Sequence, residues 1–492
     1  MTASIPPQLN RAALAGLAPA RRPLVDPRDL RPRIVHFGLG AFHRAHQAVY
    51  TEAAAARSGE PWGIVAVAPR SADAVATMRA QDCLYTVTDL APGAGGTRVV
   101  GALVDALGMR PDAARIDTLV SSPEVTTVTL TVTEKGYSRR PDTGGLDTAA
   151  PGVAADLAAT ADAGPGDLVT VVGRLAASLA ARFRTCAAPI DVVSCDNTAA
   201  NGAALAGVVR GFVEASAWPD RRVLLDWLGT SVGFPDTIVD RIVPATTPED
   251  RDAVAATLGL RDEMPVVGEP YRQWVLQDAF VAARPPWELD GALVVPDVAP
   301  YQLMKLRLLN GSHSAMAYLG AAAGCRTVAE VLATGWGERL VRSFGAEVAP
   351  TLPAAGPDAA KYVDDLVERF RNPAMHHLLR QIGSDGSLKI PERWLDALRA
   401  LRAGEAGTPT LELAVAAWVN ATRPDSAGHQ VFGTTDPATE ALARCWQDTS
   451  DPSTLVAALL RVVGAADLAE QPDLTSSVAA HLPALQAGRV EI

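Results

Sequence analysis

The chain has 492 residues, 48% of them hydrophobic and 20% charged, a length that predicts two or three domains with cores large enough to fold without disulfides or metals. Lysine and arginine number 44 against 55 aspartates and glutamates, so the formal net charge is -11. Because binding to a nucleic acid duplex needs a basic face, this charge argues against nucleic acid as the main partner.

A membrane span, a secretion signal and a metal framework are also not predicted. No stretch approaches about 18 consecutive apolar residues, the length that a transmembrane helix needs. The N-terminus has a weak apolar run without a basic segment before it, which makes a poor signal peptide. The five cysteines form no CxxC pair, and no thiol or carboxylate cluster accompanies the HxxH pair of His43 and His46. We therefore expect a soluble cytoplasmic protein with no metal site and no membrane partner.

The two halves of the chain differ in their hydrophobic pattern. From about residue 30 to 290, short β-branched runs alternate with alanine-rich helical patterns, which predicts the crossover units of a mainly parallel sheet. From about residue 300 on, apolar residues recur at i, i+3, i+4 and i+7, which predicts amphipathic helices. We expect an α/β N-terminal domain of residues 1–290 and a mostly α-helical C-terminal domain of residues 291–492. The clearest strand runs are Arg33–Phe37, Gly63–Ala68, Thr126–Thr133, Asp191–Cys195 and Val239–Val243.

A Gly-x-Gly pair, Gly38 and Gly40, follows the first predicted strand and precedes a helical pattern. In a dinucleotide fold the first glycine permits a tight turn, and the second lets the backbone approach the pyrophosphate at the helix N-terminus. The third glycine position is occupied by His43, so the pair alone is equally typical of an ordinary strand-to-helix turn. The next strand runs into Pro69, Arg70 and a serine rather than an acid. Arg70 could therefore face a 2′-phosphate or be solvated, and NAD and NADP both stay open.

The segment 300–314 is predicted to be a helix with leucines on its buried face. At about 100° per residue, Asn310 lies about 140° and His313 about 80° from Lys305, so all three can line one wall of a cavity. A lysine desolvated in a cavity can act as a general base toward an alcohol, and amides can hold the reacting oxygen. A further amide, Asn197, follows a predicted strand, where open α/β sheets keep their sites. The alternatives are a surface lysine, a buried histidine and a turn asparagine.

Eight segments together resemble the polyol-specific long-chain dehydrogenases, the family of the mannitol 2-dehydrogenases and fructuronate reductases. The resemblance implies a Rossmann-like N-terminal domain, a mostly helical C-terminal domain and chemistry without a metal. The matching segments are IVHFGLGAFHRAHQA, QDCLYTVT, LTVTEKGY, SCDNTAANG, FPDTIVDRIVP, EPYRQWV, MKLRLLNGSHSAMAYLG and SDGSLKIP.

The resemblance also implies roles for individual residues. Lys305 matches the family's general base, Asn197 and Asn310 match the amides that hold the reacting oxygen, and His313 matches an imidazole that contacts the substrate. The cofactor positions, to which Arg70 is added from its place after the second strand, are Gly38, Gly40, Phe42, Arg70, Glu134 and Lys135. The positions that resemble substrate contacts are Asp240, Arg380 and Lys389.

One position departs from the family pattern. Relatives often carry glutamate at the positions of Gln302 or Leu303, where it is thought to serve a proton path to solvent. A neutral Gln302 cannot relay a proton by titrating, so the proton route of this chain stays open.

The run LLNGSHS with AYLG, together with EPYRQWV, is more similar to the fructuronate reductases than to the mannitol enzymes. A hexuronate carries a carboxylate that favours a fork-shaped cation, which Arg380 could supply. The rival cations are Arg369, Arg371 and Lys389, which are otherwise solvated charges.

We therefore expect an oxidoreductase that uses NAD, with NADP not excluded, to interconvert a secondary alcohol and a ketone of an acyclic sugar. The expected substrate is a small sugar acid or polyol, with fructuronate and D-mannonate first, and mannitol or a pentitol such as arabinitol next. A non-catalytic nucleotide-binding sensor is the alternative from another class, because a fold does not guarantee chemistry. We expect a monomer or a weak homo-oligomer.

Overall fold

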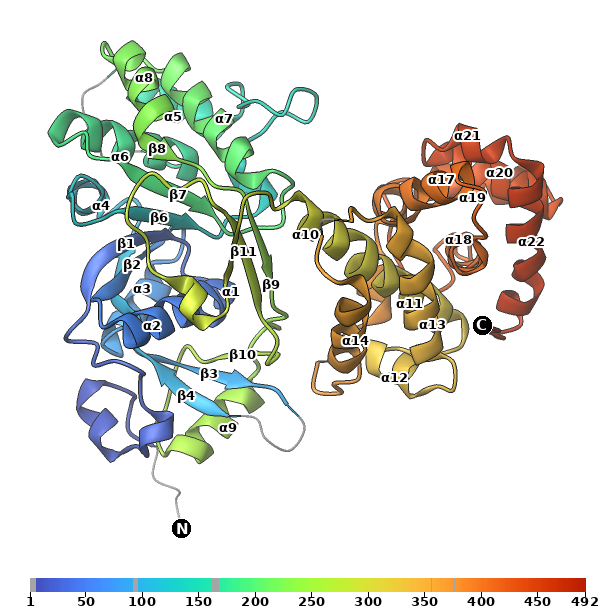
Figure 1. Cartoon of the computed structure of the whole chain (residues 1–492), viewed down its shortest axis with the longest axis horizontal. Helices are drawn as coiled ribbons and strands as arrows, with labels where there is room; N and C mark the ends of the chain where they lie inside the picture. The colour runs from blue at the N-terminus through green and yellow to red at the C-terminus, as the bar shows by residue number, and fades with distance from the viewer. Residues whose placement is uncertain (1–5, 92–95, 162–167, 355, 376) are drawn as a thin grey trace. The chain divides into compact units, whose positions relative to one another are not determined.

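The computed structural model describes residues 6–91, 96–161, 168–354, 356–375 and 377–492, and Figure 1 shows the whole chain. Its contacts form two compact units, Met1–Val298 and Ala299–Ile492. The boundary expected at residue 290 lies before β12 (Leu293–Val295), which pairs in parallel with β11 (Gln273–Gln277) and so belongs with the N-terminal unit. Within the described ranges, no helix is both long enough and apolar enough to span a membrane.

The N-terminal unit is built on a six-stranded sheet whose order is β5-β2-β1-β6-β7-β8, with every neighbouring pair parallel. Numbered by their order along the chain, these six strands run 3-2-1-4-5-6, which is the order of the doubly wound dinucleotide-binding fold. Central strands of such a sheet are buried on both faces, so they appear in the sequence as continuous apolar runs. The Rossmann-like expectation is thus confirmed. The strands are β1 (Arg31–Phe37), β2 (Trp62–Ala68), β5 (Leu103–Gly108), β6 (Thr127–Leu130), β7 (Ile190–Ser194) and β8 (Val232–Gly233).

Helices cover both faces of this sheet. Alternate residues of β1 point to opposite faces, so Ile34 packs in one hydrophobic cluster while Val35 and Phe37 pack in another. The cluster of Ile34 includes α1 (Ala41–Ala45), α2 (Gln47–Ser58) and α3 (Ala72–Ala80). The other cluster includes α4 (Ala113–Val120), α5 (Pro151–Ala159), α6 (Val171–Thr185), α7 (Asn201–Ala215) and α8 (Arg221–Ser231).

Two three-stranded sheets complete the N-terminal unit. The run Val239–Val243, expected in the parallel sheet, instead contributes β9 (Thr237–Asp240), which pairs antiparallel with β11. A β-branched run reports a strand but not its partner, which explains the difference. The remaining strands are β3 (Tyr85–Asp89), β4 (Thr97–Val100) and β10 (Val266–Gly268), and the remaining helix is α9 (Pro248–Leu258).

The described residues of the C-terminal unit form helices and turns joined by isolated bridges, which confirms the expected helical domain. Its centre is formed by α11 (Gly311–Ala322) and α18 (Pro409–Ala421), two largely buried helices that pack against each other. The surrounding helices are α10 (Ala299–Met304), α12 (Val328–Ala333), α13 (Gly337–Val348), α14 (Ala359–Phe370), α15 (Leu379–Gly383), α16 (Gly386–Ile390), α17 (Asp396–Ala403), α19 (Thr439–Asp448), α20 (Pro452–Val462), α21 (Ala466–Ala469) and α22 (Pro472–Gln486).

Candidate functional site

The two glycines after β1 have different physical reasons to be glycine. Gly38 has φ of 135°, and a Cβ at this position would overlap the Thr131 hydroxyl in the loop after β6. Gly40 is the N-cap residue of α1 with an ordinary φ of -74°, and a Cβ there would meet nothing within 4 Å. Gly38 therefore closes the turn, and Gly40 leaves free space beside the N-terminus of the helix. This is the arrangement that a pyrophosphate needs, at the point between β1 and β6 where the strand order reverses.

The third position of the glycine fingerprint carries His43, whose ring lies flat on His36 of β1 with 3.4 Å between ring centroids. His36 is hydrogen-bonded through its two ring nitrogens to Thr129 and Thr131, at 2.7 and 2.9 Å. The stacked rings of His36 and His43 thus occupy the space between β1 and α1, where the third glycine of the fingerprint would allow the helix and strand to pack closely. Burial lowers the pKa of His43 to about 3, helped by the nearby charge of Arg44, so the imidazole is neutral at ordinary pH.

Phe42 is half-buried and stacks on the buried His46, with 5.1 Å between ring centroids. Burial likewise lowers the pKa of His46 to about 3. His43 and His46 are therefore packing residues, and within the described residues no group of three His, Cys, Asp or Glu side chains is placed to hold a metal. Arg70, another predicted cofactor residue, is exposed just after β2. The next residue, Ser71, caps α3 with its hydroxyl, which accepts the Ala74 amide.

The predicted cofactor residues Glu134 and Lys135 begin η3 (Glu134–Tyr137), a short 3-10 helix in the loop after β6, and Lys135 is exposed. At the end of η3, the buried Tyr137 hydroxyl donates a hydrogen bond to the Asp196 carboxylate and is also bonded to Ser194. Burial raises the pKa of Tyr137, and the negative charge of Asp196 raises it further, so the hydroxyl stays protonated. This bond ties the loop after β6 to the loop after β7.

Asn197, the predicted oxygen-holding amide of this unit, is exposed directly after Asp196. The Asp196 carboxylate accepts bonds from the Thr198 amide at 2.9 Å and the Ser194 hydroxyl at 3.0 Å, which fixes the backbone on both sides of Asn197. Tyr137 and Asp196 were not predicted as site residues, although both lie inside the motifs LTVTEKGY and SCDNTAANG. The available signal was the position of each residue shortly after a predicted strand.

Asp240, a predicted substrate contact, is the last residue of β9 and is buried. Its negative charge opposes, in small part, the fall in the pKa of His46. Asp240 therefore lies near His46, the buried residue that follows the glycine-loop helix α1.

The predicted catalytic segment of the C-terminal unit is not a regular α-helix. Lys305 and Asn310 are the first and last residues of η5 (Lys305–Asn310), a π-helical segment between α10 and α11. A π-helix bonds residues five apart, so Lys305 and Asn310 lie about one turn apart on the same side of the helix. The offset of about 140° expected from α-helical geometry is therefore wrong for this pair. π-Helical turns are rare and occur frequently at functional sites.

A second π-helical segment, η7 (Pro391–Leu395), packs against η5 and satisfies its backbone. The Trp394 indole donates to the Gly311 carbonyl at 3.0 Å, and Arg393 donates to the Asn310 carbonyl at 3.4 Å. Arg393 also donates to the Ser314 hydroxyl at 2.8 Å. These bonds hold the transition from η5 to α11 from outside the helix.

His313 is half-buried in the first turn of α11. Its ring centroid lies 4.5 Å from that of Phe370 and 5.7 Å from that of His377. Lys305 and Asn310 are also half-buried, so all three predicted residues of this segment are accessible in part.

The two predicted substrate cations, Arg380 and Lys389, lie on consecutive short helices, and both residues are hydrogen-bonded to Ser384 between these helices. Lys389 of α16 donates to the Ser384 carbonyl at 2.6 Å, and the Ser384 hydroxyl donates to the carbonyl of Arg380 in α15 at 2.8 Å. Burial lowers the pKa of Lys389, and the charge of Arg393 lowers it further. Arg380 itself is exposed.

The site residues thus form two sets, one in each unit. The N-terminal unit carries the glycine loop, Asn197 and Asp240, and the C-terminal unit carries Lys305, Asn310 and His313 with the two cations. Their roles remain predictions from the sequence.

Comparison with known proteins gives matches over nearly the whole chain. Residues 32–289 match the mannitol dehydrogenase Rossmann domain, and residues 297–486 match the mannitol dehydrogenase C-terminal domain. The chain is 38% identical to the uncharacterized oxidoreductase YeiQ of Escherichia coli (strain K12), over 93% of this chain and 92% of that protein. It is 37% identical to the D-mannonate oxidoreductase of the same organism, over 82% of this chain and 83% of that protein.

Among solved structures, the chain is similar to the Pseudomonas fluorescens mannitol 2-dehydrogenase in a ternary complex with NAD and D-mannitol. The TM-score is 0.76 at 34% identity, and the match covers 97% of each chain.

Proposed function

Since the chain belongs to the mannitol dehydrogenase family in both of its domains, we propose that it is an NAD-dependent dehydrogenase that interconverts a secondary alcohol and a ketone of an acyclic polyol or sugar acid. The observation that supports this most is η5, which places the half-buried Lys305 and Asn310 on one side of a helix. A general base and an oxygen-holding amide are the two groups that such a reaction needs from the protein.

The N-terminal unit fits a bound dinucleotide. Gly38 closes the turn, and Gly40 leaves the space in which a pyrophosphate would meet the backbone at the start of α1. Phe42 lies in α1, which follows β1, and Glu134 and Lys135 begin η3, which follows β6. NAD supplies the acceptor for the hydride. We propose NAD rather than NADP because the mannitol 2-dehydrogenase of similar structure is complexed with NAD.

In the proposed mechanism, Lys305 Nζ takes the proton of the substrate hydroxyl during oxidation and returns it during reduction. The side-chain amide of Asn310 donates a hydrogen bond to the same oxygen and stabilises the negative charge that develops on it. His313 orients the substrate through a neighbouring hydroxyl. Lys305 must be neutral to accept the proton in oxidation and protonated to return it in reduction.

The position of Gln302 changes the proton route. Gln302 is half-buried in α10 and carries no titrating group. Lys305 therefore exchanges its proton with water without a carboxylate at position 302 or 303.

For the substrate, we propose a hexuronate, with fructuronate and D-mannonate as the reacting pair. Arg380 and Lys389 lie on the consecutive short helices α15 and α16, and a carboxylate binds well to such cations. The similarity to D-mannonate oxidoreductase supports this choice. The similarity to a mannitol 2-dehydrogenase favours mannitol and fructose as the second candidate pair.

The deciding experiment is a substrate panel with the purified full-length chain. Oxidation of NADH and of NADPH is followed at one pH against fructuronate, tagaturonate, fructose and xylulose. We expect the highest kcat/KM with NADH and fructuronate. A preference for fructose would replace the hexuronate assignment with the mannitol one, and binding of NADH without turnover of any substrate would refute the proposed dehydrogenase activity.

A further inference from the structure

The N-terminal unit contains a polar cavity whose lining includes none of the predicted catalytic or cofactor residues. Its volume is about 330 Å³, which is within the size range of small-molecule sites. It lies between α2, the β3–β4 hairpin and the loops around β11. Six charged side chains line it: Arg57, Arg98, Arg241, Arg272, Asp89 and Asp290.

One of the four arginines is committed to the protein. Arg241 is 2% exposed and donates to the Glu269 carbonyl at 2.9 Å, to the Ala45 carbonyl and to the Asp89 carboxylate at 2.5 Å. All three of its nitrogens are used in this way. Arg241 therefore builds the wall, and its charge is balanced by Asp89.

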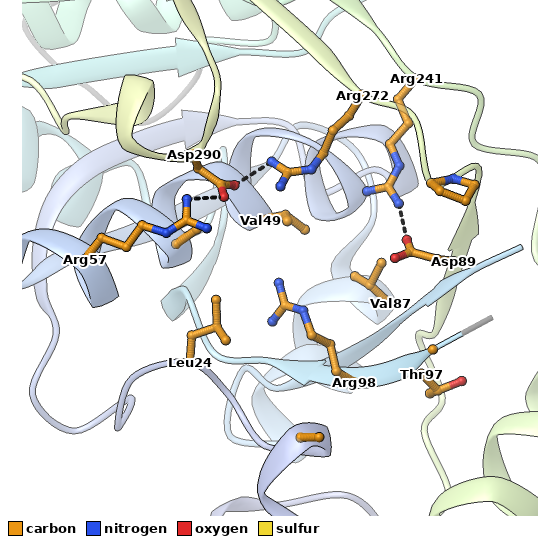
Figure 2. A pocket seen from close by; sticks show the side chains of 14 residues that line it. Leu24, Val49, Arg57, Val87, Asp89, Thr97, Arg98, Arg241, Arg272 and Asp290 are labelled. Atoms are coloured by element: carbon orange, nitrogen blue, oxygen red, sulfur yellow. Dashed lines mark hydrogen bonds and ion pairs between the residues drawn. The ribbon is translucent and has the colours of Figure 1, made fainter. Parts of the chain in front are cut away.

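The other three arginines share two carboxylates. Arg57 and Arg272 both bind Asp290, which is 5% exposed, as Figure 2 shows. Arg98 binds the fully buried Glu52, which also accepts the Gly101 amide at 2.6 Å. Three guanidiniums against two carboxylates leave an excess of positive charge around a partly enclosed space. Such an excess is unfavourable unless water or an anion compensates it.

These arginines also keep donors for a ligand. Within the described residues, the hydrogen bonds of Arg57 and Arg98 to the protein all come from Nη1. Nε and Nη2 of both side chains therefore remain as donors. In Figure 2, Arg57, Arg98 and Arg272 extend toward one another from different elements, so donors reach the space between them from several directions.

The shape of this donor set favours a tetrahedral anion. A carboxylate has two oxygens in one plane and is satisfied by one fork-shaped guanidinium. A phosphate monoester has three terminal oxygens and carries about -1.5 to -2 charges at neutral pH, so it can engage several guanidiniums at once. Apolar side chains line the cavity as well, namely Leu24, Val49, Ala53 and Val87, and they can contact a carbon skeleton.

We propose that this cavity binds a small phosphate monoester, with the phosphate between Arg57, Arg98 and Arg272 and the carbon skeleton against Val49 and Val87. The proposal does not rest on the proposed dehydrogenase activity, since it uses only residues of this cavity. It assigns the chain a second anion site besides the cofactor crevice.

Isothermal titration calorimetry of the full-length chain tests the proposal, with glucose 6-phosphate, inorganic phosphate and gluconate as probes. We expect glucose 6-phosphate to bind more tightly than inorganic phosphate, because inorganic phosphate has no carbon skeleton to contact Val49 and Val87. Gluconate should bind most weakly, because it has a carboxylate in place of the phosphate. The affinity should be unchanged when NADH is saturating. No binding of glucose 6-phosphate up to about 10 mM, or tighter binding of gluconate, would overturn the proposal.

Two variants and a control locate the site. Arg57→Ala is the mildest change, because Arg57 is 52% exposed and Asp290 keeps its bond to Arg272. Arg98→Lys keeps a cation beside Glu52 but loses the fork. Both should weaken glucose 6-phosphate binding about tenfold or more. Arg184→Ala removes a surface arginine of similar exposure that pairs with Asp220 on α6 and α8, and it should leave binding unchanged.

Competition gives the remaining outcomes. Displacement of glucose 6-phosphate by NADH or by the reacting sugar would place the anion in the catalytic site and overturn the assignment of a separate cavity. Equal losses in Arg57→Ala and Arg184→Ala would show a nonspecific charge effect and overturn it as well.

Discussion

Three histidines, His36, His43 and His46, are fully buried where the glycine-loop helix meets β1 and β11, and their burial should make the folded chain sensitive to acid. Burial lowers the pKa of His43 and of His46 to about 3, and it lowers the pKa of His36 well below its usual range. In the unfolded chain an imidazole takes up a proton below a pH of about 6.5. Acid therefore stabilises the unfolded state while the folded state stays unprotonated, and the loss of stability accumulates as the pH falls from about 6.5 toward 3.

The size of the effect follows from proton linkage. For a group that titrates at about 6.5 when unfolded and at about 3 when folded, lowering the pH from about 7.5 to about 5.5 reduces the free energy of unfolding by about 1.4 kcal/mol. His43 and His46 together should contribute about 3 kcal/mol. His43→Phe retains a ring that can stack on His36 but removes one of these titrating groups.

Differential scanning calorimetry at the two pH values measures the difference, since the two units can unfold as separate transitions. Between these pH values, the Tm of the N-terminal transition should fall about 2 °C less in His43→Phe than in the parent chain. His429→Phe, which removes an exposed histidine of the C-terminal unit, is the matched control and should behave as the parent does. Identical pH dependence in His43→Phe and the parent would refute the reasoning.

Three further predictions concern the site. Lys305→Ala should lower kcat about 100-fold or more and leave the Kd for NADH unchanged. The control Lys361→Ala, which changes a surface lysine, should keep the kcat of the parent chain. Steady-state kinetics measure both, and a normal kcat in Lys305→Ala would refute the general-base assignment. Gly38→Ala should destabilise the N-terminal unit by about 2 kcal/mol or more, because the φ of Gly38 is positive and a Cβ there would overlap Thr131. Gly40→Ala should fold normally but bind NADH about tenfold more weakly. Calorimetry measures the stability and fluorescence titration the binding of NADH, and equal stability of the two variants would contradict the turn geometry. Tyr137→Phe loses the hydrogen bond to Asp196, the residue before Asn197, so kcat should fall while the Kd for NADH stays constant. Weaker binding of NADH with an unchanged kcat would show that Tyr137 supports the cofactor loop instead.

The elements that the sequence predicts well are those whose surroundings are uniform. β1, β2 and β7 are buried on both faces, so their apolar runs indicate strands without reference to any particular neighbour. β9 was predicted as a strand but not with its partner, because β11 lies in a different part of the sequence and pairing depends on tertiary context.

The candidate site divides in the same way. Gly38 and Gly40 were predicted by motif, and the structure gives each a physical reason. The π-helical turn at Lys305 was not predictable, because its leucines have the spacing of an ordinary amphipathic helix and its support comes from η7, about 80 residues later in the chain. His43 was read as a missing glycine, and only its ring stacking on His36 shows what the position does.

The π-helical segment η5 also constrains how the chain can change its length. A π-helical turn contains one residue more than the α-helical turn it replaces, so deletion of Leu306 or Arg307 could restore a continuous α-helix from α10 into α11. Such a deletion would preserve helical hydrogen bonding and leave the buried residues of α11 in place, and it would set Lys305 and Asn310 four residues apart, about 40° from each other around an α-helix. We therefore expect a shortened chain that folds and keeps its base and its amide on one side of the helix. The same deletion within the regular α11 would rotate the residues on one side of it by about 100° relative to those on the other, so η5 is where this helix best tolerates the loss of a residue.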